Sequence, residues 1–582
     1  KSIRYAKRWR IEPSDSAAYR RGELVRPVKQ LVFYIDSLMP VKWNPYIKAG
    51  AESWNKAFEK IGFKDVICVK EFPKNDTLFN ANSFDCMTIR YSASWLNSAQ
   101  TTIHSDTRTG EILNASILIN ANMISVQYAD RIGATVAIDP RVRTTVFPQE
   151  IQGELIQAAI AQAVGTGLGL TMNWGASCAY PVDSLRSASF TQKYGLASSV
   201  MGGVIINDVA TEEDVRNGVC LVNAKPGPYD ELVIKYLYQP IYASSLQEEK
   251  ETLDSWIREH TGDPYYAYIR NQSRFDSDPR NSRGSLGDDH LKSFDYMLPN
   301  VRKGFENYYS WFAKEDRDFL MRRRVHSALS ERLSGRIYAI LSYIGGIYLN
   351  DIREKDAIPS YSMVDREKQK AALSKALELA KNLDWVDDTA HLNEFEISDK
   401  KADRLRLDIF NGIFGRLPYV EVCTERFPDA AYTASEYLDD IYGIVWEGVL
   451  KHRPLENFER ALQTAFLESI ISTSTATAPI GSFKASKTGF AATGKPEINL
   501  AALRNGGKVD MKMYSLQNAE EVAGFSSIPP IYTNQTKIAA YYFDLLMRTK
   551  DMLKKAISTA PEADRSHYDL LIYRINKATE IE

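Results

Sequence analysis

The 582-residue chain contains only five cysteines, and no two of them form a CxxC pair. They are scattered at Cys68, Cys86, Cys178, Cys220 and Cys423. This odd number and wide spacing argue against a zinc knuckle and against a full disulfide framework, although at most two bridges could form. The cysteines therefore leave the cellular compartment open.

Charge excess and long apolar runs are also missing. The 72 Lys and Arg residues are balanced by 74 Asp and Glu residues, which gives a net charge of −2. We expect no nucleic-acid partner, because such partners are bound by basic surfaces. The longest apolar runs, such as residues 337–349, are too short to span a bilayer, so no transmembrane segment is predicted.

The chain begins at Lys1 without an initiator Met or a signal peptide. We therefore expect a processed or trimmed product, whose missing N-terminus could have carried a lipid anchor.

Histidine is scarce, and none of the seven lies between His104 and His260. The sequence also contains no GxSxG, GxGxxG or P-loop motif. None of the enzyme classes that these motifs define is therefore indicated.

The first 226 residues alternate between strand-like and helix-like segments. The predicted elements are strands at 30–36, 65–70, 86–92 and 107–120 and helices at 47–61 and 149–168. Glycines follow both helices, as is typical of helix ends. The order predicts an α/β, or α+β, domain over residues 1–226.

From residue 227 the pattern becomes mostly helical, which predicts a large helical domain over residues 227–471. Residues 472–535 are rich in Ser, Thr and Gly and are predicted to form an irregular insert. Residues 536–582 read as two amphipathic helices, and we expect a hairpin packed on the helical domain.

The stretch QAAIAQAVGTGLGLTMNWG (157–175) has the length and glycine stop of a helix that carries zinc in one class of protease. Such a helix needs His at i, i+4 and i+10, a Glu at i+1 as proton acceptor, and a Gly at i+7. Only Gly169 fits this template. The other four places, which we call the degenerate positions, hold Gln162, Ala163, Thr166 and Met172. Neutral oxygens and a thioether are poor zinc ligands, and taken alone such a helix is more often an ordinary buried one.

The flanking sequences change this interpretation. RGELVRPVKQLVFYID (21–36), NWGASCAYPVDSLRSASFTQKYG (173–195) and GPYDELVIKYLYQPI (227–241) resemble the large zinc-dependent metalloproteases common in Bacteroidota. These metzincin-like proteins are usually exported and often lipid-anchored. The resemblance covers nearly the whole chain and is weakest over residues 472–530. It implies an HExxHxxGxxH motif before Asn173, and this motif falls on the degenerate positions.

The resemblance also implies a Met-turn. SSVMGG (198–203) is similar to that turn, with Met201 as its methionine. Gly202 and Gly203 stand where the family tends to have an acidic residue and a Tyr, so a hydroxyl that could steady a tetrahedral intermediate is absent. A shifted alignment register cannot supply zinc ligands, because no His is available nearby.

Other candidate residues are weaker. His104 is predicted to be a solvated loop residue. Glu150 and Glu154 could share a cation, but acidic residues in a first helical turn more often complement the helix dipole. Cys178 lacks a neighbouring base, so we expect a packed or idle thiol. Asp183 is expected to order a turn.

In metzincin-like folds the substrate lies in extended form along an edge strand above the metal helix. We assign this role to the predicted strand over residues 112–120. The expected peptide groove comprises Ile112, Asn114, Ser116 and Trp174. The alternative is that Trp174 or Met172 fills the groove, or that a loop blocks it.

These observations predict a pseudoprotease: a catalytically inactive metzincin-like protein without a metal or other cofactor. We expect it to bind a peptide or a protein at the cell envelope, in the periplasm or at the outer membrane. One alternative is an active hydrolase or peptidase whose site cannot be recognised from sequence. The other is a purely structural subunit of an outer-membrane complex.

Overall fold

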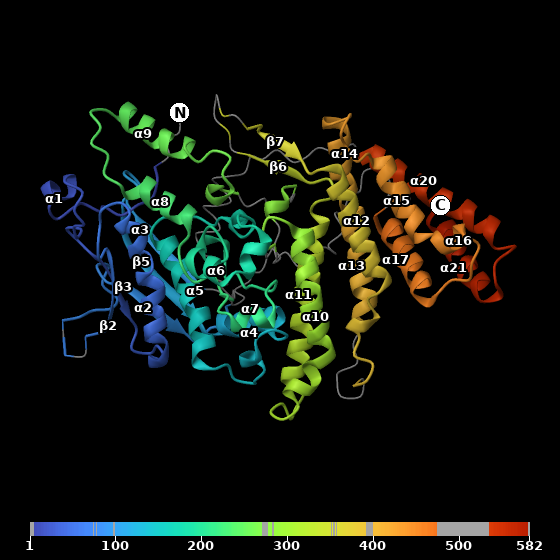
Figure 1. The fold of residues 1–582 in the computed structure, drawn as a ribbon, viewed down its shortest axis with the longest axis horizontal. Coiled ribbons are helices and arrows are strands. Elements are labelled where there is room, and N and C mark those ends of the chain that lie inside the picture. The colour runs from blue at the N-terminus through green and yellow to red at the C-terminus, as the bar shows by residue number, and fades with distance from the viewer. Residues whose placement is uncertain are drawn as a thin grey trace, which may run out of the picture. The chain divides into compact units, whose positions relative to one another are not determined.

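The computed structural model describes residues 5–579, except residues 74, 77, 97–98, 270–276, 282–284, 351, 353–355, 357, 392–399 and 474–534. The chain forms two compact units, Lys1–Thr433 and Ala434–Glu582 (Figure 1). The first contains a mixed sheet followed by helices, and this confirms the predicted fold class.

The first unit is built on a five-stranded sheet with the order β2-β1-β3-β5-β4. The strands are β1 (Leu31–Ile35), β2 (Ile67–Glu71), β3 (Met87–Ser92), β4 (Ala99–Ser105) and β5 (Ile112–Asn120). Four strands run parallel, and β4 alone is antiparallel to its neighbour β5. The two form a hairpin, because Gly110 adopts a φ of 78° in the connecting turn. The sequence predicts every strand of this sheet except β4.

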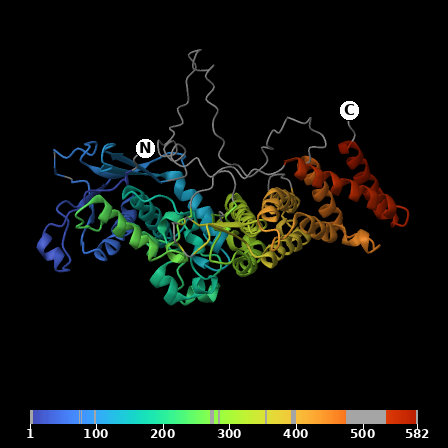
Figure 2. The ribbon, with the colours of Figure 1, turned by 90° about the horizontal axis from the view of Figure 1, so that it is seen from above.

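Helices α2 (Asn44–Glu52) and α5 (Gln149–Gly167) lie on one face of the sheet (Figures 1 and 2). Alternate residues of β1, such as Phe33, point into the core between sheet and helices. The two helices approach closely, since a Cβ added at Gly50 would lie 2.6 Å from the carbonyl oxygen of Gln157. The glycine in α2 therefore permits this close approach of the two helices.

Further elements complete the first unit. They are α1 (Ser16–Arg20), α3 (Asn55–Glu59), α4 (Ala121–Thr135), α6 (Ala188–Tyr194), α7 (Glu212–Arg216), α8 (Pro228–Tyr238), α9 (Leu246–Arg258), α10 (His290–Phe312), α11 (Leu320–Leu341), α12 (Arg366–Lys381), α13 (Lys401–Gly415), α14 (Leu417–Arg426) and the hairpin strands β6 (Ile347–Leu349) and β7 (Tyr361–Met363).

The predicted domain boundary after residue 226 falls inside this unit, because later helices pack tightly on earlier ones. Where α11 crosses α4, a Cβ added at Gly133 would lie 2.5 Å from the carbonyl oxygen of Ala328. A buried ion pair spans the same boundary. The carboxylate of Asp208 accepts hydrogen bonds from Nε of Arg332 at 2.6 Å and from Nε of Arg336 at 2.9 Å.

The second unit is helical. Its helices are α15 (Ala434–Val445), α16 (Glu447–Leu450), α17 (Asn457–Thr473), α20 (Gln535–Ala556) and α21 (Glu562–Thr579). The two predicted closing helices correspond to α20 and α21, which pack on each other and on α17. The predicted insert at 472–535 lies outside the described residues apart from its ends.

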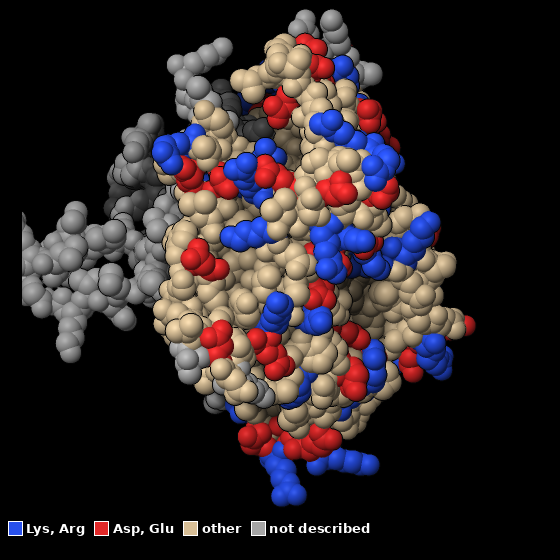
Figure 3. Space-filling model, turned by 90° about the vertical axis from the view of Figure 1, so that its left-hand side faces the viewer, with Lys and Arg blue, Asp and Glu red and all other residues tan. Residues whose placement is uncertain are grey.

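Charges of both signs are interspersed on the described part of the face shown in Figure 3, and they leave wide uncharged areas between them. This distribution agrees with the net charge of −2. In the part of the chain that the structure describes, no helix combines the length and apolarity that a membrane crossing requires.

The Asp208 ion pair gives a test of the packing across residue 226. Replacing Asp208 by Ala strands the buried guanidinium of Arg336, so we expect a loss of about 3–5 kcal/mol in the free energy of unfolding. Asp183→Ala is the matched control, because the Asp183–Lys292 pair is solvent-exposed and should change that free energy by less than about 1 kcal/mol. Urea denaturation measures both. Equal losses in the two variants would contradict a special role for Asp208.

Candidate functional site

Two residues after the end of helix α5, Gly169 occupies a position that no other residue could take without strain. The amide of Leu168 donates to the carbonyl of Val164 at 2.8 Å, and the amide of Leu170 donates to that of Gly165 at 3.1 Å. Gly169 then turns the chain with a φ of 93°. A Cβ there would lie 2.1 Å from the carbonyl oxygen of Lys7. The backbone thus stops and reverses where the zinc-helix template requires it.

The chain reversal brings the first and last degenerate positions into contact. Nε2 of Gln162 donates a hydrogen bond to Sδ of Met172 at 3.2 Å. Thr166 lies one helical turn after Gln162, and its hydroxyl donates to the Gln162 carbonyl at 3.4 Å. All three side chains are half-buried. Ala163 is buried, and its carbonyl accepts from the hydroxyl of Thr101 on β4 at 2.8 Å.

The Met-turn lies against the same helix. It is a 3-10 turn over Val200–Gly202, and Met201 is fully buried. A Cβ added at Gly165 of α5 would lie 2.6 Å from Sδ of Met201. The Met201 carbonyl accepts from the amide of Asn173 at 3.0 Å. Met201 therefore supports both the helix and the segment that follows it, as the resemblance implies for a Met-turn.

A buried carboxylate holds this turn in place. Asp230, near the start of α8, accepts from the Ser199 hydroxyl at 2.5 Å and from the amides of Val200 and Gly227 at 2.9 Å each. Burial raises the pKa of Asp230 to about 7, although these three donors lower it. The sequence does suggest a helix start at GPYD, with Pro at its first position and Asp two residues later. Sequence reasoning misses that this Asp reaches the Met-turn.

The chemistry of the four degenerate positions does not fit zinc. An amide, a hydroxyl and a thioether replace the charged or imidazole ligands that Zn²⁺ takes in proteins, and Ala163 cannot accept a proton. Within the described ranges, no group of three or more His, Cys, Asp or Glu residues is placed to hold a metal ion. Gly203, where the resemblance implies a Tyr, has a φ of 96°, and a Cβ there would meet no atom within 4 Å. The backbone conformation, and not a lack of space, therefore favours glycine at this position.

The predicted peptide groove is wrong, because β5 is not an edge strand. It pairs with β3 on one side and with β4 on the other. A Cβ added at Gly167 of α5 would lie 3.4 Å from Cβ of Ala115, so Ala115 faces the helix. Asn114 and Ser116 alternate with it and therefore point to the opposite face of the sheet.

The other two groove residues are also poorly placed. Ile112 is 2% exposed and belongs to the core. Trp174 is half-buried at the start of a 3-10 turn over Trp174–Cys178. The strand that lies at the edge, next to α5, is β4. Sequence reasoning misses β4 because its alternating pattern is weak and only its pairing with β5 defines it.

Glu154 and Cys178 do not form sites of their own. The carboxylate of Glu154 lies 3.8 Å from the buried guanidinium of Arg131, and burial raises the pKa of Glu154. Cys178 is buried, which raises the pKa of its thiol, and its Sγ contacts the carbonyl of Arg280 at 3.6 Å. A buried, protonated thiol of this kind is the packed cysteine that the sequence predicts.

His104 and Asp183 lie on ordered elements. His104 is exposed on β4 and not in a loop, contrary to the prediction, because β4 itself was not anticipated. Asp183 lies in a 3-10 turn, where its carboxylate accepts from Lys292 and Tyr296. The second carboxylate of the proposed cation pair, Glu150, lies in the first turn of α5.

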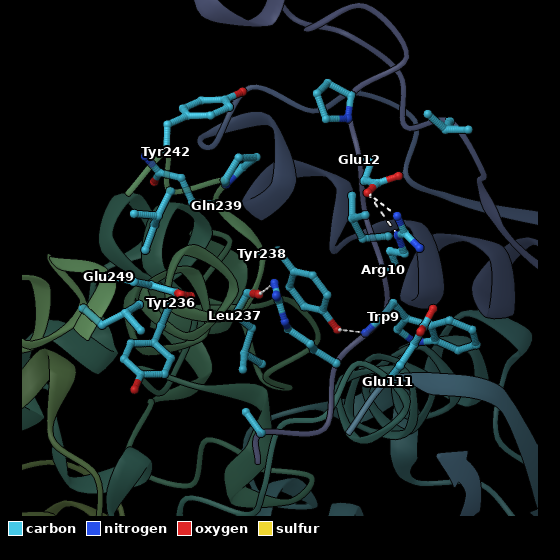
Figure 4. A pocket seen from close by; sticks show the side chains of 18 of the residues that line it. Trp9, Arg10, Glu12, Glu111, Tyr236, Leu237, Tyr238, Gln239, Tyr242 and Glu249 are labelled. Atoms are coloured by element: carbon cyan, nitrogen blue, oxygen red, sulfur yellow. Dashed lines mark hydrogen bonds and ion pairs between the residues drawn. The ribbon is translucent and has the colours of Figure 1, made fainter. Parts of the chain in front are cut away.

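A groove of about 760 Å³ opens elsewhere in the first unit, between the N-terminal segment and helices α8 and α9 (Figure 4). The hydroxyl of Tyr238 accepts from the Trp9 amide at 3.3 Å, and the side chain of Arg8 donates to the Leu237 carbonyl at 2.8 Å. None of the degenerate positions lines it. The groove is therefore distinct from the degenerate positions, although its lining residues Trp9 and Tyr238 donate hydrogen bonds to the carbonyls of Gly167 and Leu168 at the end of α5.

The raised pKa of Asp230 predicts a pH-dependent stability. Between its ordinary value of 3.8 and about 7, the folded chain holds a proton that the unfolded chain releases. The contribution of Asp230 to the free energy of unfolding is therefore fully present below pH 4 and is lost as the pH rises through about 7. Each unit of difference between the folded and unfolded pKa corresponds to about 1.4 kcal/mol of this contribution. Asp230→Asn imitates the protonated acid, so its unfolding free energy should fall less than that of the wild type between pH 4 and 8. Identical pH profiles in denaturant titrations would contradict this.

Comparisons with known proteins agree with this geometry. No curated protein and no solved structure matches the chain. The sequence profile of one family, described as Met-zincin, matches residues 144–453. This range is more than half of the chain and includes α5, the degenerate positions, the Met-turn and Asp230. The chain belongs to the Met-zincin family.

Proposed function

We propose that this protein is a catalytically inactive metalloprotease homologue that binds a peptide or a protein segment. The observation that carries the proposal is the contact between Gln162 and Met172. Backbone geometry brings the ligand positions together as a zinc site would need, yet the groups that meet are an amide and a thioether. Without a bound metal, water keeps its pKa of about 15.7 and yields no hydroxide nucleophile at neutral pH.

The edge strand β4 supports the binding role. In the described part of the chain, no other strand pairs with the side of β4 that faces away from β5. Such an edge can add an extended peptide through main-chain hydrogen bonds, and this needs no catalyst. The hydrogen bond from Thr101 to the Ala163 carbonyl fixes β4 beside the helix of the degenerate positions. A bound peptide would therefore run past these positions.

We further propose that the protein acts at the cell envelope, as the exported relatives it resembles do. Its partner would be a free peptide or a component of an outer-membrane complex. Affinity isolation from native membranes separates these roles. A stable stoichiometric partner favours a structural subunit, whereas substoichiometric, exchangeable peptides favour a peptide binder.

The inactivity of the wild type can be measured directly. We expect no stoichiometric zinc in the purified protein and no metal-dependent cleavage of casein. Both can be assayed by elemental analysis and by peptide release with and without a chelator. Stoichiometric zinc together with chelator-sensitive cleavage would overturn the proposal and favour an active hydrolase.

Restoring the family residues should create a metal site. The variant Gln162→His, Ala163→Glu, Thr166→His and Met172→His should bind one zinc ion, because α5 and the turn after Gly169 already hold these positions together. The matched control keeps Ala163 and should bind zinc equally, since the Glu is not a ligand. Proteolysis need not return, given Gly202 and Gly203. A folded variant without zinc would count against the proposed site geometry.

Two proline variants test the β4 edge. Successive backbone amides of a strand point in opposite directions, so only one of Thr102 and Ile103 donates toward β5. The variant whose proline replaces the amide that points away from β5 removes no hydrogen bond of the sheet, so it should keep the wild-type melting temperature. The same variant, Thr102→Pro or Ile103→Pro, should fail to capture the peptides or proteins that the wild type captures from envelope extracts. Full capture by it would contradict binding along β4.

A further inference from the structure

A second, smaller cavity of about 310 Å³ lies on the face of the sheet opposite to α5. Strands β3, β4 and β5 form its floor, and residues 81–84 form one wall. The cavity is separate from the degenerate positions and from the outer edge of β4. A ligand bound in it would therefore be independent of the proposed function.

The strand register collects polar side chains on this floor. Thr102 of β4 lies opposite Ser116 of β5, and His104 lies opposite Asn114. Ile89 pairs with Ile117, and continuing this parallel register by one residue places Thr88 beside Ser116. One row of hydroxyls therefore crosses three strands, and it has the imidazole and the amide as its neighbours.

Arg90 orients several of these groups so that their hydrogens remain available. Its Nε donates to the Thr88 hydroxyl oxygen at 3.2 Å, and its Nη2 donates to Oδ1 of Asn82 at 2.8 Å and to the carbonyl of Ala81 at 2.6 Å. Thr88 and Asn82 act as acceptors toward Arg90, so the hydroxyl hydrogen of Thr88 and the NH₂ group of Asn82 can donate to a ligand.

The charge of Arg90 has no neutralising carboxylate in its described surroundings. No Asp or Glu lines the cavity. Among the residues that the structure describes, no carboxylate lies within ion-pair distance of Arg90, which is on β3, although Arg108 in the neighbouring β4–β5 hairpin pairs with Asp106 at 2.8 Å. Arg90 is a half-buried cation whose hydrogen-bond partners are neutral acceptors, and two of them, Thr88 and Asn82, carry hydrogens of their own. This arrangement is a favourable place for an anion.

We propose that this cavity binds an oxyanion group, a carboxylate, sulfate or phosphate, through Arg90 with Thr88, Thr102 and His104 as further donors. Phe84 lies at its rim, is 53% exposed and stands 5.7 Å from the His104 ring. An apolar body attached to the anion would lie against this phenyl ring. The site therefore fits a small organic acid or an acidic group on a larger molecule.

Calorimetric titration with benzoate, sulfate and inorganic phosphate, at constant ionic strength set with chloride, tests the proposal. We expect saturable binding of at least one anion. Tighter binding of benzoate would identify a carboxylate ligand that uses Phe84, and tighter binding of sulfate or phosphate would identify a tetrahedral anion. Arg90→Met should weaken binding about tenfold or more, because charge-assisted hydrogen bonds are lost.

Matched variants keep the result decisive. Arg108→Met, in the turn of the neighbouring β4–β5 hairpin, changes the net charge equally and should bind like the wild type. Because Arg90 also contacts residues 81 and 82, the double variant Thr102→Val with His104→Gln provides a second test: both side chains are exposed, and binding should weaken about threefold or more at an unchanged melting temperature. No saturable binding of any of the three anions, wild-type affinity in Arg90→Met, or equal weakening in Arg108→Met would overturn the proposal.

Discussion

Helix α5 lies so close to the chain beneath it that Gly165 has no room for a side chain. Sδ of Met201 and the indole of Trp54 occupy the space that a Cβ would need. The Trp54 indole also donates to the carbonyl of Ala161 in the same helix at 2.8 Å. This contact fixes the helix relative to the Met-turn and, through the helix, the sheet edge beside it. The backbone geometry around the degenerate positions depends on this contact.

The backbone framework of this region and the chemistry of the four degenerate positions rest on different atoms. Gly169, Met201 and Asp230 act through backbone conformation, packing and buried hydrogen bonds. Among the degenerate positions Ala163 is buried and the other three are half-buried, and the neutral side chains of Gln162 and Met172 contact each other. Contacts made by residues outside the degenerate positions therefore hold the backbone around those positions.

The two faces and the outer edge of the sheet have separate properties. One face carries α5 and the apolar core. The opposite face carries a polar cavity whose only guanidinium has no carboxylate partner among the described residues. The edge at β4 offers backbone, next to α5, with which no other described strand pairs. The proposed binding at the edge would use backbone groups in the plane of the sheet, whereas the proposed binding in the cavity would use side chains that stand on its face.

The sequence alone determined the features that depend on local structure and on residue identity. Helical spacing and Gly169 define α5, apolar runs define β1, β2, β3 and β5, and the lack of any His between 104 and 260 rules out a shifted zinc motif. Only the tertiary structure decided which strand is at the edge, that Asp230 reaches the Met-turn, and that Arg90 forms no ion pair with any described carboxylate. Each of these depends on pairing between segments far apart in the chain. The local sequence cannot predict such pairing, because the same strand could pair with several other strands and the same carboxylate could pair with several other residues.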